Sequence, residues 1–163
     1  MNMTPQFARS LKNTRAYDEK PTAQGKHYTT VGIISKEGMT FDHTFQGYLN
    51  KEYFIYLLKF FIIPMFKNTT KYLIMDNCSS HNNKDVIKLL KENNVNYLFL
   101  SPYSPEYNPI ELAWSKIKNF IKKCKARCEL FLWLAIKSAI ASITEEDING
   151  YFNHVNKYYL NLV

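Results

Sequence analysis

The sequence predicts an α/β domain that contains a parallel βαβ unit and an antiparallel hairpin. A strand, helix, strand and helix alternate between residues 71 and 123, which indicates a parallel βαβ unit because parallel strands need a crossover connection. Residues 27–47 have the pattern of an antiparallel hairpin. The chain has 163 residues and is 46% apolar, enough to fill the core of one domain covering 1–163.

The first part of the chain predicts an arm, a hairpin and a helix. Residues 1–26 are polar and basic without a clear period, as in an extended arm or loop. Segments 27–35 and 39–47 are rich in β-branched and aromatic residues and flank a turn that ends in glycine. An apolar helix is expected over 50–66, too short to span a bilayer and broken at Pro64.

The predicted alternation of strands and helices lies in the middle of the chain. Residues 71–77 and 96–101 are short apolar runs suited to buried strands. Between them, residues 85–94 place apolar side chains at helical spacing until Asn93 and Asn94 end the pattern.

The last part of the chain is expected to be helical. An apolar stripe is formed by Trp114, Ile117, Ile121, Cys124 and Cys128. A second helical segment follows over 127–143, and Thr144 with Asp147 imitates the capping box of a final helix.

The charge of +7 favours a polyanionic partner, nucleic acid rather than an anionic membrane. Lys118, Lys122 and Lys125 recur at helical spacing, with Lys116, Lys123 and Arg127 beside them. Such a face can bind DNA phosphates, although a merely solvated lysine face has the same pattern.

The cysteines indicate a reducing compartment, and we expect a cytoplasmic protein. Their number is odd, and Cys78, Cys124 and Cys128 lack the spacing of a disulfide framework. Cys124 and Cys128 are interpreted as two small apolar positions on one helix face rather than half a zinc site.

Two acids are candidate metal ligands. Asp76 ends a predicted strand and Glu111 follows the neighbouring one, and ligands gather at the carboxyl ends of parallel strands. Carboxylate pairs bind Mg²⁺, and two such ions can act on a phosphodiester.

Structural alternatives exist for both acids. Glu111 with Asn108 and Pro109 fits a capping box, and Asp76 fits a turn after a strand. His81 could orient a substrate or water, or lie near a helix start without a catalytic role. A triad of Asp76, His81 and Ser79 or Ser80 is disfavoured because residues so close along the chain rarely converge.

The motif DN..SH, followed by SPYSPEYNPIELAWSKIK, resembles the catalytic core of mariner-type DDE transposases, particularly their bacterial insertion-sequence branch. The match extends from Arg15 to Tyr159, and 34 residues separate Asp76 from Glu111. The resemblance implies an RNase H-like fold, a mixed sheet flanked by helices with strand order 3-2-1-4-5, and two Mg²⁺ or Mn²⁺ ions. It also implies cutting and joining of DNA phosphodiesters by a protein associated with the bacterial nucleoid.

The resemblance also implies roles for single residues. Asp76 would be the second catalytic acid and metal ligand, and Glu111 the third. Asn77 and His81 match positions near the metal site. The segment that aims the glutamate is matched by Pro102, Tyr103, Pro105, Asn108, Pro109 and Trp114.

Two parts of the family pattern are expected but are not found in the 163 residues. The first acid is expected on the central strand, yet Met1 stands where that strand should just have ended, and Asp18 and Asp42 are poor substitutes. The helix-turn-helix region is missing too. We therefore expect a C-terminal transposase fragment that is inactive alone, with transposon-end and target DNA, a second copy or an upstream-frame fragment as partners. The alternatives are a non-catalytic DNA-binding or assembly remnant that interferes with intact transposase, and a product that does not fold.

Overall fold

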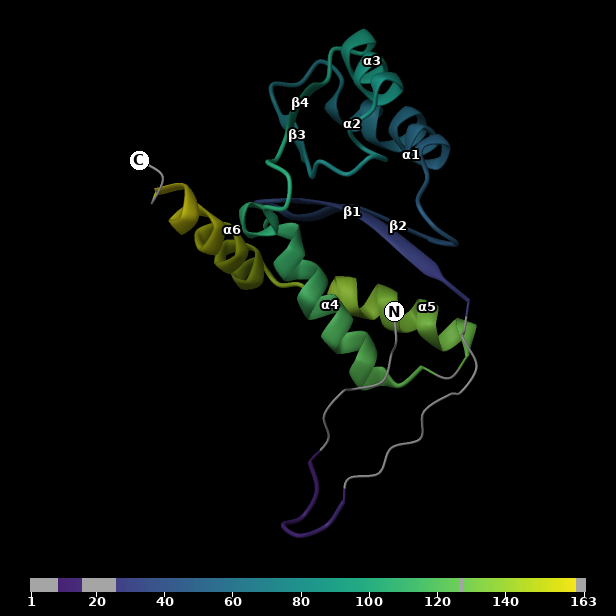
Figure 1. Cartoon of the computed structure of the whole chain (residues 1–163), viewed down its shortest axis with the longest axis vertical. Helices are drawn as coiled ribbons and strands as arrows, with labels where there is room; N and C mark the ends of the chain where they lie inside the picture. Colours follow the sequence, from purple (N-terminus) through teal and green to yellow (C-terminus); the bar gives the residue numbers. More distant parts are fainter. Residues whose placement is uncertain (1–8, 16–25, 127, 161–163) are drawn as a thin grey trace. The chain divides into compact units, whose positions relative to one another are not determined.

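The computed structural model describes residues 9–15, 26–126 and 128–160 (Figure 1). Its chain divides into two compact units. The hairpin unit comprises residues up to Gln46 together with Ile110–Asn153, and the parallel-strand unit comprises Gly47–Pro109 and the chain from His154 onward. The predictions for Asp18 and Arg127, and most of those for the 1–26 arm, lie outside the described residues.

The hairpin unit contains the predicted antiparallel pair, β1 (Tyr28–Ser35) and β2 (Gly38–Gln46). The register extends from Tyr28 opposite Gln46 to Ser35 opposite Gly38, with one irregularity after Ile33. Gly38 has φ +128°, a conformation that residues with a Cβ rarely adopt, so glycine closes the turn. The hairpin prediction is confirmed.

Helices α4 (Ile110–Cys124) and α5 (Glu129–Ala141) lie side by side in the same unit (Figure 1). Their facing residues form a buried cluster of Ile117, Ile121, Ala135, Ile136 and Ala139. Met39 of the hairpin and Trp114 pack against this cluster. The apolar stripe predicted on α4 is therefore confirmed as far as Ile121.

The prediction that Cys124 and Cys128 continue this stripe is wrong. Helix α4 ends at Cys124, and the next residue, Lys125, has a left-handed φ of +46°. Cys128 precedes the first residue of α5. The two exposed cysteines thus flank a helix break and do not share one helix face.

Helix α6 (Glu145–Leu160) begins with the predicted capping box. The Thr144 hydroxyl accepts a hydrogen bond from the Asp147 amide at 3.2 Å, and Asp147 Oδ2 accepts one from the Thr144 amide at 2.8 Å. Lys116 of α4 forms an ion pair with the same Asp147 oxygen. This contact joins the start of α6 to α4.

The parallel-strand unit begins with a helix in which Pro64 is accommodated. Asn50 caps α1 (Lys51–Leu57) by accepting from the Tyr53 amide at 2.8 Å. A π-helical turn, η1 (Leu58–Ile62), leads without interruption into α2 (Ile63–Phe66). The predicted break at Pro64 is wrong: the wider turn accommodates a proline ring that would clash with a carbonyl in an α-helix.

Strands β3 (Tyr72–Met75) and β4 (Asn96–Phe99) pair in parallel, with α3 (Lys84–Glu92) as the crossover. The βαβ prediction is confirmed. Leu73 and Met75 are buried, but Tyr72 and Ile74 are 57% and 55% exposed. Alternate side chains of β3 are buried, so the expectation of a buried strand is confirmed for one face of the strand only.

The described strands form two separate two-stranded sheets, β1–β2 and β3–β4. The resemblance implies a central strand between such pairs, and none of the described strands occupies that position in the hydrogen-bonding order. A short 3₁₀ helix, η2 (Pro105–Tyr107), precedes α4. None of the helices in the described ranges has the length and apolar character needed to cross a membrane.

Gly32 in β1 lies against the Trp114 indole, so replacing it with alanine should strain the hairpin unit. An added Cβ would lie 2.9 Å from Trp114 Cη2 and 3.3 Å from Met39 Sδ. We expect Gly32→Ala to lower the free energy of unfolding by about 1–3 kcal/mol, the usual effect of overpacking. Gly150→Ala in α6, where nothing lies within 4 Å, is the control and should raise it by about 0.5–1 kcal/mol. Urea denaturation measures the free energy of unfolding of both variants. Equal changes in the two variants would contradict a specific clash at Gly32.

The charge of Asp147 should stabilise the hairpin unit in a pH-dependent way. The hydrogen bond from Lys116, followed by those from Thr144, lowers the pKa of Asp147 from 3.8 to about 2. Because the pKa is depressed in the folded state, the stabilisation is present above pH 3.8 and disappears as the pH falls through 2. We expect Asp147→Asn to cost on the order of 1 kcal/mol near pH 6.

Urea denaturation at several pH values tests this effect. The difference in the free energy of unfolding between wild type and Asp147→Asn should shrink steadily as the pH falls from 5 to 2.5. The exposed neighbour Glu145 provides the control, since Glu145→Gln should show a small difference at every pH. If the difference in the free energy of unfolding between wild type and Asp147→Asn did not change with pH, the charge of Asp147 would have no role in stability.

Candidate active site

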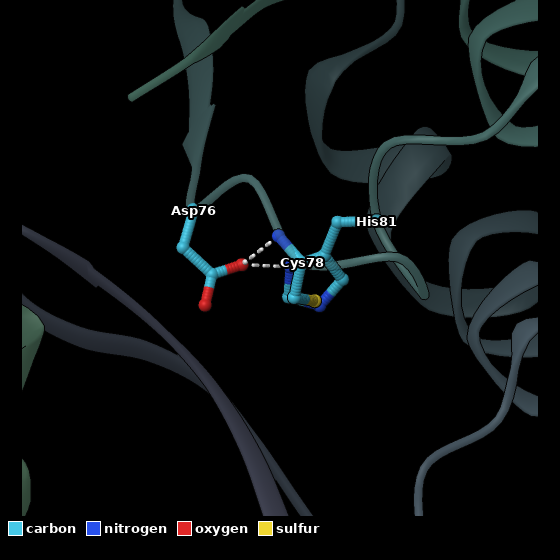
Figure 2. A group of neighbouring side chains, drawn as sticks. All are labelled: Asp76, Cys78 and His81. Atoms are coloured by element: carbon cyan, nitrogen blue, oxygen red, sulfur yellow. Dashed lines mark hydrogen bonds and ion pairs between the residues drawn. The ribbon is translucent and has the colours of Figure 1, made fainter. Parts of the chain in front are cut away.

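Asp76 lies directly after β3, at the carboxyl end of the parallel pair. Its side chain is 54% exposed, and its Oδ1 atom lies 2.5 Å from Nδ1 of His81 (Figure 2). The same oxygen accepts a hydrogen bond from the Cys78 amide at 3.4 Å. Both contacts hold the carboxylate through the same oxygen, and about half of the side chain stays accessible to a ligand.

His81 is held between this carboxylate and an aromatic ring. Its imidazole packs on Phe54 of α1 with ring centroids 4.3 Å apart. Phe54 is buried, and the His81 side chain is only 19% exposed. The buried ring thus fixes the imidazole that orients Asp76.

Backbone and amide hydrogen bonds order the loop between Asp76 and α3. The Cys78 carbonyl accepts from the amides of His81 at 3.0 Å and Asn82 at 2.8 Å, which forms a tight turn. The Asn82 side-chain amide donates to Asn77 Oδ1 at 2.5 Å. Asn77, a predicted supporting residue, therefore braces the loop.

Asn83 connects this loop to the helix that follows. Its Oδ1 accepts from the Val86 amide at 3.0 Å and so caps α3, while its Nδ2 donates to the Ser80 carbonyl at 3.1 Å. The N-cap residue of α3 is therefore Asn83 and not His81. One side chain thus fixes both the helix start and the turn.

The surroundings of the loop shift two pKa values. Partial burial raises the pKa of Asp76, but the charge of His81 and the hydrogen bonds from His81 and Cys78 outweigh it and leave the pKa below its ordinary value. Burial, reinforced by Asp76, raises the pKa of the Cys78 thiol. Asp76 is therefore ionised, and available to a cation, throughout the neutral range.

Asp76, Cys78 and His81 converge (Figure 2), and their oxygen, sulfur and nitrogen atoms all lie within 4.8 Å of one another. The sequence predicted Asp76 and His81 but missed Cys78, whose C-x-x-H spacing to His81 is the signal that could have revealed it. In the described part of the chain, neither the Ser79 nor the Ser80 hydroxyl bonds His81, so no serine triad forms.

Glu111 lies exposed in the first turn of α4, which belongs to the hairpin unit, whereas Asp76 belongs to the parallel-strand unit. A shared metal site therefore stays a prediction. The Asn108 amide donates to the Pro105 carbonyl at 3.0 Å, closing η2, and α4 begins just after Pro109. The Glu111 side chain thus does not close the capping box that the sequence offered as an alternative.

The lysines of the predicted basic face differ in their surroundings. Lys116 forms its ion pair with Asp147, whereas Lys118 is exposed and Lys122 is half-buried on α4. Lys125 is exposed just beyond the helix. Asp42 of β2 forms an ion pair with Lys137 of α5.

Asn83 offers a test of how the loop is held. Asn83→Asp should keep the helix cap but lose the donor to Ser80, whereas Asn83→Ala should lose both and cost about 1 kcal/mol of stability. We expect amide exchange of His81 and Asn82 to accelerate in both variants, and exchange at Val86 only in Asn83→Ala. Unchanged exchange at His81 in Asn83→Asp would show that the turn holds without this bond.

Comparison with known proteins shows which family the chain belongs to. The family described as DDE superfamily endonuclease matches residues 1–130. No curated protein matches the sequence significantly.

Solved structures of the Mos1 mariner transposase share the fold. The Mos1 strand transfer complex has a TM-score of 0.72 at 14% identity, over 94% of this chain and 46% of that one. The catalytic domain of Mos1 has a TM-score of 0.61 at 13% identity, over 82% and 74%. The paired-end complex with Mn has a TM-score of 0.65 at 15% identity. This chain spans about half the length of the full Mos1 chains. The match over most of its length shows that the chain belongs to the DDE endonuclease superfamily, with the α/β fold of the mariner catalytic domain.

Proposed function

We propose that the chain is part of a DDE transposase that cuts and joins DNA phosphodiesters with two divalent metal ions. The observation that carries this proposal is the position of Asp76, an ionised, exposed carboxylate at the carboxyl end of a parallel strand, oriented by His81. Membership of the DDE endonuclease superfamily supports it. Assignment to the bacterial insertion-sequence branch, and a place beside the DNA of a bacterial cytoplasm, remain predictions from the sequence.

The donors present fit Mg²⁺ or Mn²⁺. Asp76 and Glu111 both offer exposed carboxylate oxygens, the ligands that these hard ions prefer. One of the Mos1 structures is a complex with Mn. A bound pair of ions would stabilise the attacking and leaving oxygens of the phosphodiester.

Each supporting residue has a positioning role in this proposal. His81 keeps Asp76 ionised and fixes its orientation through the 2.5 Å contact. Asn77 braces the loop through Asn82. Asn108 and Pro109 set the point at which α4 starts, and hence the direction of Glu111.

Binding of DNA is proposed for the lysines of α4 and its end. Lys118, Lys122 and Lys125 add positive charge beyond Glu111, and such charges bind phosphates in a salt-dependent way. Lys116 contributes less, because Asp147 neutralises it. The Mos1 neighbours include a complex with the left transposon end. Transposon ends and target DNA are the partners we propose, together with a second copy or an upstream-frame fragment.

The 163-residue polypeptide carries two of the three acids that the resemblance requires. We therefore expect the polypeptide of this length to bind DNA and Mn²⁺ without nicking DNA. The second candidate function, a non-catalytic DNA-binding or assembly remnant, is favoured by the separation of the described strands into two small sheets.

Manganese binding tests the proposal directly. Electron paramagnetic resonance of free Mn²⁺ should show binding by the wild-type chain, weakened on the order of tenfold or more in Asp76→Asn and in Glu111→Gln. Glu146→Gln is the matched control for Glu111, since both are exposed glutamates in the first turn of a helix. Supercoiled plasmid should remain intact with Mg²⁺ or Mn²⁺.

Three results would change the proposal. Salt-dependent DNA binding without any binding of Mn²⁺ would favour the non-catalytic remnant. Equal loss of Mn²⁺ affinity in Glu146→Gln would remove Glu111 from the site. Nicking that disappears in both Asp76→Asn and Glu111→Gln would show that two acids suffice for cleavage.

A further inference from the structure

We propose that Asp76, Cys78 and His81 form a binding site for one thiophilic divalent cation of the Zn²⁺ type. This inference goes beyond the proposed function and does not depend on it. All three donors lie in one loop of the parallel-strand unit, so the site needs neither Glu111 nor any residue of the hairpin unit.

The donor set has the composition of a zinc site. Zn²⁺ binds cysteine sulfur at about 2.3 Å, histidine nitrogen at about 2.0 Å and carboxylate oxygen at about 2.0–2.2 Å. Two atoms bound to the same ion are therefore at most about 4.6 Å apart. The three donor atoms already lie within 4.8 Å of one another, so adjustments of the side chains alone bring them into range.

The backbone brings these donors together before any ion binds. The turn closed by the His81 amide on the Cys78 carbonyl at 3.0 Å brings positions 78 and 81 close together. The Cys78 amide also binds Asp76 Oδ1, which draws the carboxylate toward the same turn. Phe54 packs on His81 and Asn83 bonds the Ser80 carbonyl, so the His81 end of the turn is already held and less conformational freedom is lost on binding.

The ligand types decide which cation the site prefers. Mg²⁺ prefers oxygen ligands to a thiolate or an imidazole, whereas Zn²⁺ and Co²⁺ bind both sulfur and nitrogen ligands. Binding converts the Cys78 thiol to a thiolate, and its proton passes to solvent. Cys78 and Asp76 are exposed, so the fourth coordination position is open to water. A zinc ion here would occupy the carboxylate proposed for Mg²⁺ or Mn²⁺, so Zn²⁺ is expected to compete with these ions for Asp76.

Cobalt provides the first test, because a cobalt–thiolate bond has a charge-transfer absorption in the near ultraviolet. Titrating the reduced 163-residue chain with Co²⁺ should produce this band and saturate at one equivalent. The band should disappear in Cys78→Ser and weaken in His81→Gln. Cys124→Ser and Cys128→Ser are matched controls, since both cysteines are also exposed and free, and they should keep it. Zn²⁺ should displace the cobalt, and a large excess of Mg²⁺ should not.

A second test uses only the wild-type chain, so it does not depend on the folding of a variant. Alkylation with iodoacetamide, followed by mass spectrometry, reports the reactivity of each cysteine. Zn²⁺ should slow alkylation of Cys78 at least about tenfold and leave Cys124 and Cys128 unchanged. Equal protection of all three cysteines, or none, would overturn the proposal, as would a cobalt band that survives Cys78→Ser.

The outcomes separate this site from the proposed function. A cobalt band that depends on Cys78, with no binding of Mn²⁺ that depends on Asp76 and Glu111, would leave the thiophilic site and refute the transposase proposal. The reverse pattern would refute the thiophilic site alone.

Discussion

The short connection between β3 and α3 is the constraint on which the candidate site depends. Two parallel strands require a crossover, so the chain must leave β3 at its carboxyl end and enter a helix on the way to β4. Asn83 joins the turn within this connection to the helix after it, because its Nδ2 atom donates to the Ser80 carbonyl and its Oδ1 atom accepts from the Val86 amide. Asp76, Cys78 and His81 owe their proximity to that compact path.

The parts of the fold that the sequence predicted correctly are those determined by nearby residues. The hairpin follows from its β-branched strands and Gly38, the crossover from its apolar spacing, and the start of α6 from Thr144 and Asp147. The end of α4 at Cys124 was missed, because apolar residues continue the helical spacing across a left-handed Lys125. The exposed face of β3 was missed because only tertiary packing decides which side of an apolar strand is covered.

In the candidate site, too, the sequence predicted what depends on a local motif and missed what depends on the folded structure. Asp76 and His81 were recognisable from the motif, but the role of Cys78 appears only once the turn brings its sulfur beside them. The relation of Asp76 to Glu111 could not be derived from local pattern, since the two acids lie in different compact units. Lys116 looked like its neighbours in sequence, and only the capping of α6 reveals its different partner, Asp147.

The π-helical turn at Leu58–Ile62 has a consequence for comparing this protein with others. The Ile63 amide bonds the Leu58 carbonyl, five residues back, so the turn contains one residue more than an α-helical turn. Every side chain after it is rotated relative to those before it. A relative whose helix lacks the wider turn will align correctly on both sides only if one residue within Leu58–Ile62 is left unmatched.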